Sequence, residues 1–242
     1  MGLWHVFYED WQMECCGTPF SVGDEVSWPL LLLDADTVLG GGWRDQVTEV
    51  AGPVEDVGGV RMVQEETGLP VALGADPDAE EDPRPQPGSR SRAAGLLCVE
   101  RHGARWPEAG GRVRAVQVLT QTWAETTPGS RSYEPVAGER GLRAVERCPR
   151  WFTETEGERA SDGRGRRSRE SGVVVTLDVP GTDSRLSRAL REARGISGPS
   201  VEPGAETRGI EAADLAALLE TLSTARPPRR PTGRARRRHA GG

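Results

Sequence analysis

The sequence predicts a mainly β protein, a small barrel or compact antiparallel sheet with a flexible C-terminal extension that carries one or two helices. Its apolar runs are short and are interrupted every few residues by Gly, Pro or Asp, which is typical of strands joined by turns. Leu, Ile, Val and Phe account for only 46 of the 242 residues and are absent from 76–95, 153–171 and 223–242. The remaining sequence holds enough of them for a modest core.

The N-terminal β part spans residues 1–75. We expect a first strand at 3–8 and a second segment in which Val26, Trp28, Leu30 and Leu32 share one face by period-2 alternation. Pro29 within that segment indicates an edge position or a bulge. Two further strands are predicted at 43–50 and 57–64.

An acidic, Pro-rich loop or linker is predicted at 76–95, followed by the second β part of the same domain at 96–180. Strands are expected at 96–101, 112–122 and 142–152. Residues 153–171 predict a charged loop, and 172–179 is the strongest strand signal in the chain because of its consecutive valines.

The extension at 181–242 changes to helical periodicity. A short helix near 184–194 is expected to be capped by Asp183 and ended by Gly195. A second helix near 210–224 places four leucines on one face, and these are candidate partner-binding residues: Leu215, Leu218, Leu219 and Leu222.

Charge is distributed unevenly along the chain. The net charge is −6, yet residues 1–100 carry 19 acidic side chains against five arginines, whereas 226–242 carry seven arginines and no acidic residue. The longest aliphatic run, 30–33, is far shorter than a membrane span. We therefore expect a soluble cytoplasmic protein with an acidic body and a basic tail.

Four cysteines are present, and in a cytoplasmic chain of this length we expect free thiols. Cys15 and Cys16 are adjacent, so a disulfide between them would be strained. If they lie in a strand, one thiol faces the core and the other faces outward.

Two chemical alternatives centre on these thiols. Cys98 and His102 have the spacing C-x3-H, and with Cys15 and Cys16 they are candidate ligands of a mixed Cys/His zinc site. Alternatively, His102 assists Cys15 or Cys16 as a nucleophile, since a thiolate needs a base or a cation beside it at neutral pH.

Arginine clusters suggest a third class of function, association with nucleic acid through phosphate contacts. The alternative is that the basic tail folds back on the acidic body or keeps the chain soluble. The candidate residues are Arg164, Arg166, Arg167, Arg169, Arg236, Arg237 and Arg238.

Seven tryptophans against three phenylalanines is an unusual ratio. We expect most of them to pack in or around the core, with a Trp-lined ligand or peptide groove as the alternative. The sequence contains no P-loop and no G-x-S-x-G motif, and Gly163-Arg-Gly165 lacks the strand-to-helix context of a dinucleotide site. No cofactor is predicted.

The stretch from Trp11 to Trp28 resembles the opening of an uncharacterised actinobacterial family with the signature W-Q-M-x-C-C-G-x-P-F-x-V-G-D-x-V-x-W. A looser similarity continues through the segment Arg101-His102-Gly-Ala-Arg-Trp-Pro and the strand at 172–179. The resemblance implies a bacterial, intracellular domain of unknown function over roughly 1–180. It supplies no activity and no catalytic residue.

The function most consistent with these observations is a non-catalytic protein-interaction module that uses the barrel surface and the leucine stripe at 215–222. This hypothesis rests on the lack of catalytic motifs together with an amphipathic helix outside the core. A metal- or thiol-dependent enzyme and a nucleic-acid-associated protein are the alternatives.

Overall fold

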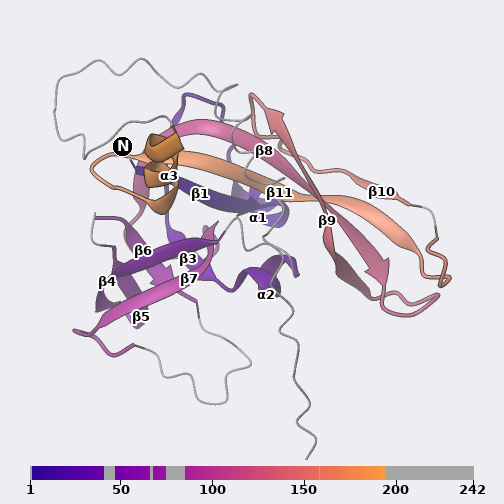
Figure 1. Ribbon diagram of the computed structural model, residues 1–242, viewed down its shortest axis with the longest axis horizontal. Coiled ribbons are helices and arrows are strands. Elements are labelled where there is room, and N and C mark those ends of the chain that lie inside the picture. The colour runs from indigo at the N-terminus through magenta and orange to yellow at the C-terminus, as the bar shows by residue number, and fades with distance from the viewer. Residues whose placement is uncertain (1, 41–46, 66–67, 75–84, 158, 194–242) are drawn as a thin grey trace, which may run out of the picture.

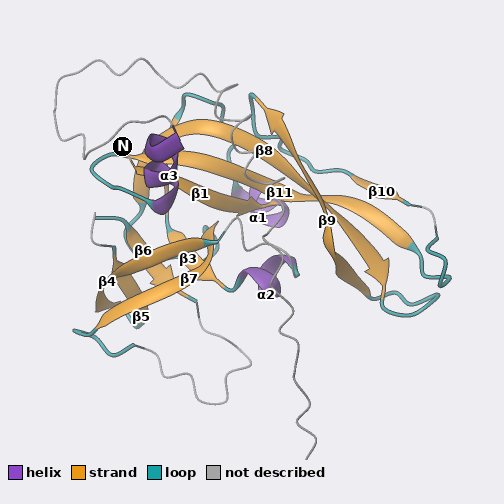
Figure 2. Cartoon of the chain, in the orientation of Figure 1, coloured by secondary structure: helices purple, strands orange, loops and turns teal. Residues whose placement is uncertain are grey.

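The computed structural model describes residues 2–40, 47–65, 68–74, 85–157 and 159–193. Within these ranges the chain forms one eleven-stranded sheet and three short helices (Figures 1 and 2), which confirms the mainly β prediction. The sheet is mixed rather than purely antiparallel, because two of its strand pairs run parallel.

Three long strands form a curved layer: β1 (Gly2–Glu9), β8 (Ala109–Glu125) and β11 (Arg166–Val179). β11 lies between the other two and pairs antiparallel with both. A short strand, β2 (Glu25–Trp28), pairs with the beginning of β8. Consecutive side chains of β1 point to opposite faces, and nearly all of them are buried, so both faces of this layer are covered.

Five strands close into a small ring: β3 (Leu30–Leu33), β4 (Thr48–Val57), β5 (Val60–Gln64), β6 (Pro70–Leu73) and β7 (Arg90–Val99). Each bonds to two others, in the order β7, β3, β6, β5, β4 and back to β7. The closure leaves little room: a Cβ on Gly52 would lie 1.9 Å from the carbonyl oxygen of Gln64. The pairing of Phe7 with Cys98 joins the ring to β1.

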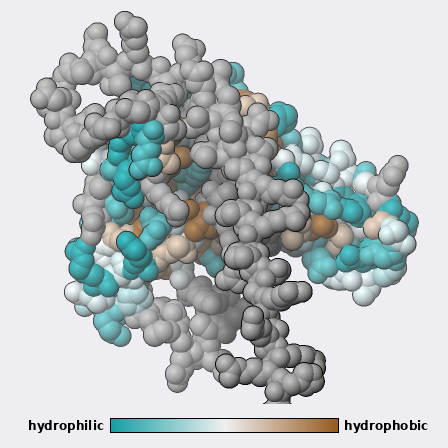
Figure 3. Space-filling view, in the orientation of Figure 1, coloured by the Kyte–Doolittle hydropathy of each residue, from teal (hydrophilic) through white to brown (hydrophobic). Residues whose placement is uncertain are grey.

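The outer halves of β8 and β11 continue beyond the body as an arm (Figure 1). Here β9 (Tyr133–Val145) pairs with β8, and β10 (Glu154–Glu156) pairs with β11. Most side chains of β9 and β10 are exposed. Figure 3 accordingly shows the arm covered mainly by hydrophilic residues.

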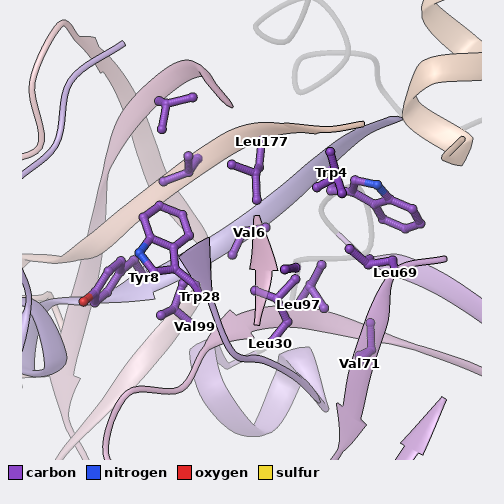
Figure 4. Close-up of a cluster of buried hydrophobic side chains, with 14 of the residues drawn as sticks. Trp4, Val6, Tyr8, Trp28, Leu30, Leu69, Val71, Leu97, Val99 and Leu177 are labelled. Carbon is purple, nitrogen blue, oxygen red and sulfur yellow. The ribbon is translucent and has the colours of Figure 1, made fainter. Parts of the chain in front are cut away.

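The main core fills the space between the curved layer and the ring. In Figure 4, Trp4, Val6 and Tyr8 of β1 face this core, to which the ring contributes Leu97 and Val99. Complete burial of a large apolar side chain contributes roughly 1.5–3 kcal/mol. This cluster therefore holds the two parts of the sheet together.

Two helices cover the opposite face of the layer. α2 (Ala35–Leu39) packs Ala35 and Leu39 against Phe7 and its neighbours, and α3 (Arg185–Ala193) packs Leu190 against Leu3. The remaining helix, α1 (Asp10–Cys16), follows β1 directly.

The strands predicted at 3–8, 112–122 and 172–179 are confirmed, as is the shared face of Val26, Trp28, Leu30 and Leu32. Pro29 separates β2 from β3, which pair with different strands. The strand predicted at 57–64 begins later, after a turn at Gly58 and Gly59, whose φ angles are +62° and +87°.

Two predicted loops are wrong in part. β7 begins at Arg90, inside the loop expected at 76–95, and β10 and the beginning of β11 lie inside the loop expected at 153–171. Neither segment has large apolar side chains. Their backbones pair with strands that are already part of the sheet, and such pairing needs no apolar residue of their own.

The strand predicted at 142–152 is displaced. β9 begins nine residues before the predicted start, at Tyr133, and ends at Val145. Residues 146–152 instead lead toward α1, and the backbone N–H of Cys148 donates to the carbonyl oxygen of Phe20 at 2.8 Å. The strand predicted at 43–50 falls partly outside the described residues, and β4 begins at Thr48.

The short helix predicted near 184–194 is confirmed as α3, but the predicted cap is wrong. Ser184, not Asp183, accepts from the backbone N–H of Ser187, at 3.1 Å, while the carboxylate of Asp183 binds Arg191. Helix α2 and strand β6 have no counterpart among the predicted elements. Gly195 and the helix predicted near 210–224 lie outside the described residues.

Candidate functional site

Helix α1 carries the densest group of chemically distinctive side chains. Asp10 begins the helix, accepts from the backbone N–H of Trp11 at 2.8 Å and forms an ion pair with Arg169 of β11. Gln12 and Met13 are buried, whereas Trp11, Cys15 and Cys16 are exposed. The helix therefore presents a Trp and two thiols to solvent.

The buried amide of Gln12 attaches α1 to the end of β7. Its Nε2 donates to the carbonyl oxygen of Val99 at 2.9 Å and to Glu9 Oε2 at 3.2 Å. Its Oε1 accepts from the backbone N–H of Arg101 at 2.8 Å. Because both ends of the amide are bonded, α1 has a fixed position against residues 99–101.

Glu9, beside this amide, lies in a partly buried position. Burial raises the pKa of its carboxyl group, the hydrogen bond from Gln12 lowers it, and the nearby charges of Asp10 and Glu100 raise it. The first effect is the largest, so the pKa of Glu9 is above its usual value.

Residues 150–152 hold the other side of α1. Arg150 donates to the carbonyl oxygen of Glu14 at 3.0 Å and also to that of Gly17, and so satisfies carbonyls at the end of the helix. The backbone N–H of Phe152 donates to Glu14 Oε1 at 3.1 Å. A segment about 135 positions away in the sequence is thereby fixed beside the helix.

Gly17 ends the helix in an extended conformation, with φ −73° and ψ 158°. A Cβ at this position would lie 2.6 Å from the sulfur of Met13 and 2.8 Å from the hydroxyl oxygen of Tyr8. A Cβ would also lie 2.7 Å from the Cα of Met13, so any larger residue here would force the end of the helix to shift.

One exposed tryptophan lies in α1 and a second lies in the segment that bonds to it. Trp11 is 44% exposed and Trp151 is 68% exposed, and these are the exposed large hydrophobic side chains of the described residues. The ring of His102 packs edge-on against Trp11, with 5.9 Å between centroids, and the guanidinium of Arg150 lies 5.7 Å from the ring centroid of Trp151. We call the region formed by Trp11, Cys15, Cys16, His102 and Trp151 the α1 surface.

Tyr8 lies beneath this surface. Its ring packs against Phe20 and Trp28 at centroid distances of 6.2 and 5.5 Å, and Figure 4 shows its hydroxyl oxygen at the margin of the apolar cluster. The hydroxyl is buried without a hydrogen-bond partner. Burial raises the pKa of Tyr8 to about 12, and the nearby charges of Arg101 and Cys16 act in opposite directions.

The expectation that one of the adjacent thiols faces the core is wrong, because Cys15 and Cys16 lie in a helix and both are exposed. Cys16 Sγ donates to the carbonyl oxygen of Gln12 at 3.4 Å. Desolvation raises the pKa of Cys16, and so does a hydrogen bond with Cys15.

The other two cysteines are core residues. Cys98 packs among Phe7, Leu96 and Val174, and burial raises its pKa well above the usual thiol value. Burial likewise raises the pKa of Cys148 to about 12. All four cysteines are free thiols, as the sequence predicts.

The structure does not bring the four predicted zinc ligands together. Cys15, Cys16 and His102 belong to the α1 surface, whereas Cys98 is buried on the side of the sheet that α2 covers. The backbone N–H of His102 donates to Glu100 Oε1 at 2.6 Å. Across the described ranges, no three His, Cys, Asp or Glu side chains form a group that could hold a metal ion.

The predicted basic patch at 164–169 consists of paired arginines. Arg164 contacts Asp162 and Glu134, Arg166 contacts Glu139, and Arg167 contacts Glu154 while it lies 3.9 Å from the ring centroid of Tyr133. Arg169 contacts Asp10. These ion pairs tie the arm strands to one another and to α1.

The remaining predicted site residues lie outside the described residues. These are Arg236, Arg237 and Arg238 of the tail, and Leu215, Leu218, Leu219 and Leu222 of the leucine stripe.

The sequence analysis did not identify Arg150 and Trp151 as residues of this site. Both fell within a predicted strand, and the sequence signal at this position, Arg-Trp-Phe after a Cys-Pro pair, does not indicate which helix it contacts. The sequence analysis expected most of the tryptophans to pack in or around the core, and it did not single out Trp11 as exposed.

No helix in the described part of the chain is long and apolar enough to span a membrane. The model of a family described as "Family of unknown function (DUF6578)" matches residues 2–179. Comparisons with the curated proteins and with the solved structures give no match.

Proposed function

The chain belongs to the family of unknown function DUF6578, and from the geometry of the α1 surface we propose that it is a non-catalytic protein-interaction module. The observation that carries this proposal is the position of Trp11 and Trp151. Of these two exposed large hydrophobic side chains of the described residues, Trp11 lies in the first turn of α1, and Trp151 lies between Arg150 and Phe152, which both bond to Glu14 of that helix.

Exposed tryptophans of this kind suit a binding surface. Trp, Tyr and Arg contribute most of the energy at protein interfaces, and a few of them near the centre of a contact dominate the affinity. The α1 surface offers two Trp side chains, with Arg150 beside Trp151. Its backbone is held on both sides, by Gln12 and by Arg150, so little ordering is needed when a partner binds.

The charge beside the tryptophans indicates the chemistry of the partner. Arg101 is exposed, and Arg150 donates only to backbone carbonyls. Within the described ranges no ion pair joins either guanidinium to an acidic side chain. We therefore propose a protein segment that presents acidic and apolar side chains.

This proposal replaces the surface expected from the sequence alone. The leucine stripe at 215–222 lies outside the described residues, whereas the α1 surface is formed by residues of the matched family region. The actinobacterial origin and the cytoplasmic location remain predictions from the sequence.

The chemical alternatives have less support from the described geometry. A catalytic thiol needs a lowered pKa, but the pKa of Cys16 is raised, and the arginines at 164–169 are paired with acidic side chains. Neither observation favours a thiol nucleophile or a nucleic-acid surface over a protein contact.

The test is quantitative co-purification of the full chain from the cells that naturally produce it. We expect at least one protein to be captured by the unmodified chain and lost with Trp11→Ala/Trp151→Ala, since truncating an interface hot spot costs about 2 kcal/mol or more, roughly thirtyfold in affinity. Arg131→Ala, at an exposed position between β8 and β9, should retain it.

An unchanged thermal unfolding midpoint of the double variant establishes that it remains folded. Capture of the same set of proteins by the unmodified chain and by the folded double variant would contradict the proposal.

A further inference from the structure

The acidic and apolar segment proposed to bind the α1 surface has a counterpart in this chain itself. Residues 210–224, which lie outside the described residues, hold four leucines in the i, i+3, i+4, i+7 pattern of an apolar helix face. They also hold three acidic side chains and no arginine. An inference that names this segment as the occupant rests on the proposed function of the α1 surface.

The α1 surface carries positive charge beside Trp11. Arg101 and Arg105 are exposed on the same loop as His102, whose ring packs against Trp11. Among the described residues neither guanidinium forms an ion pair. At the other tryptophan, the guanidinium of Arg150 donates only to backbone carbonyls. Each tryptophan therefore has a cation near it that lacks an acidic partner in this part of the chain.

The acidic side chains of the same region are already hydrogen-bonded. Glu14 Oε1 accepts from the backbone N–H of Phe152 at 3.1 Å, and Glu100 Oε1 accepts from the backbone N–H of His102 at 2.6 Å. Carboxylates from another segment would thus find the arginines, and not these two acids, in need of a partner.

The helical period of 210–224 puts acidic side chains at one end of the leucine stripe. Glu211 is four positions before Leu215, and Asp214 is four positions before Leu218, so in a helix both lie next to the stripe. A helix that lays its leucines on the tryptophans would bring these two carboxylates toward the arginines at one end of the contact.

The chain that follows α3 is long enough to reach α1. The backbone N–H of Leu3, near the beginning of β1, donates to Ser187 of α3, and α1 begins where β1 ends. At about 3.3 Å per residue, β1 separates these two places by roughly 25 Å. Residues 194–209 span up to roughly 50 Å when extended. A tether that covers the distance keeps the segment near the surface at an effective concentration on the order of millimolar, so even weak docking is populated.

We propose that residues 210–224 dock on the α1 surface of the same chain. The leucine stripe covers Trp11 and Trp151, and Glu211 and Asp214 face the arginines. The segment then competes with any other protein that binds this surface.

Photo-cross-linking of the purified full chain, with no other protein present, tests this docking. A photoreactive phenylalanine replaces Leu218 of the stripe or, as the matched control, Ala217, which the helical period puts on the other side of the helix. Irradiation at low chain concentration should join position 218, within one chain, to peptides that contain residues 9–17, 101–107 or 149–152. Mass spectrometry identifies these peptides, and position 217 should not form them.

Substitutions on each side of the contact should lower the yield of this product. Trp11→Ala/Trp151→Ala should lower it about tenfold or more, because truncating interface hot spots weakens binding by at least that factor. Arg131→Ala, at an exposed position away from α1, should leave it unchanged. Glu211→Gln/Asp214→Asn alters no described residue and should lower the yield about twofold or more, the usual effect of exposed ion pairs.

Three results would overturn the inference: equal yields at positions 217 and 218, a product formed only between two chains, or a yield that the folded tryptophan variant leaves unchanged. The measurement involves no other protein, so its failure would leave the docking of a separate partner unaffected. An intramolecular product without any captured protein would instead support the docking of 210–224 and contradict contact with a separate partner.

Discussion

The side-chain amide of Gln12 joins helix α1 to the end of strand β7, because its Oε1 accepts from the backbone N–H of Arg101 at 2.8 Å. The same amide donates to the carbonyl oxygen of Val99 at 2.9 Å. One buried side chain thus pairs two backbone groups of a segment 87 to 89 positions away, and it sets where Trp11 and the two thiols lie.

Replacing this amide tests how much it contributes to the stability of the fold. Gln12→Leu leaves a buried carbonyl and N–H without their partner, so the free energy of unfolding should fall by about 1–3 kcal/mol for each group that water cannot reach. Urea denaturation measures the change. Gln86→Leu, the same replacement at an exposed position, should stay within about 0.5 kcal/mol, and equal effects of the two variants would contradict this role of Gln12.

Gly172 of β11 provides a second test, because it pairs with Glu9 of β1 and follows a register shift in the pairing of β11 with β8. Its φ is +139°, and a Cβ there would lie 2.3 Å from the carbonyl oxygen of Tyr8. In Gly172→Ala the strained backbone conformation should lower the free energy of unfolding by about 1–3 kcal/mol. The close contact of the added Cβ should lower it further.

The matched control for this test is Gly141→Ala in β9, where a Cβ meets nothing within 4 Å. We expect it to change stability by no more than about 0.5 kcal/mol. A Gly172→Ala variant as stable as Gly141→Ala would show that β11 does not pass as close to Tyr8 as described.

Ser187 tests whether helix α3 is part of the folded body, although the family match ends at residue 179. The backbone N–H of Leu3 donates to Ser187 Oγ at 2.6 Å, and this contact is buried. Ser187→Ala should therefore cost about 1–3 kcal/mol in the free energy of unfolding. Ser27→Ala, at an exposed position, is the control, and its effect should be close to zero.

Much of the fold could be predicted from the sequence because the order of apolar residues along a strand shows whether one face or both faces are buried. The strand at 172–179 is buried on both faces, and its run of valines identified it without other information. Val26, Trp28, Leu30 and Leu32 were assigned to the correct face for the same reason. The arm could not be found in this way, since its strands pair through their backbones and through ion pairs such as Arg166 with Glu139.

The site was only partly predictable. The signature from Trp11 to Trp28 drew attention to the thiols, but the helical conformation of 10–16 was not foreseen, and the predicted placement of one thiol in the core followed from that error. Seven residues are too few for a clear helical period. Gln12 and Arg150 act through contacts about 90 to 140 positions away, and no local pattern reports such contacts.

Stability should depend on pH in the alkaline range. Burial raises the pKa of Cys148 from 9.0, and that of Tyr8 from 10.0, to about 12 in each case. Between these values the unfolded chain loses a proton that the folded chain keeps, so rising pH favours unfolding.

The free energy of unfolding should therefore decrease as the pH rises from about 9 to about 12. Urea denaturation at a series of pH values measures this change. Tyr8→Phe removes one of the two groups and should reduce the slope above pH 10, where the phenol of the unfolded chain ionises. A free energy of unfolding that does not change over this interval would show that neither group is as buried as described.

The central claim is that the α1 surface contacts another protein, and cross-linking at Trp151 tests it most directly. A photoreactive phenylalanine placed at position 151 of the full chain, in the cells that naturally produce it, should form covalent adducts with a partner protein on irradiation. The same residue at position 131, an exposed control, should form none of these adducts. Equal adducts at both positions, or none at position 151, would contradict the claim.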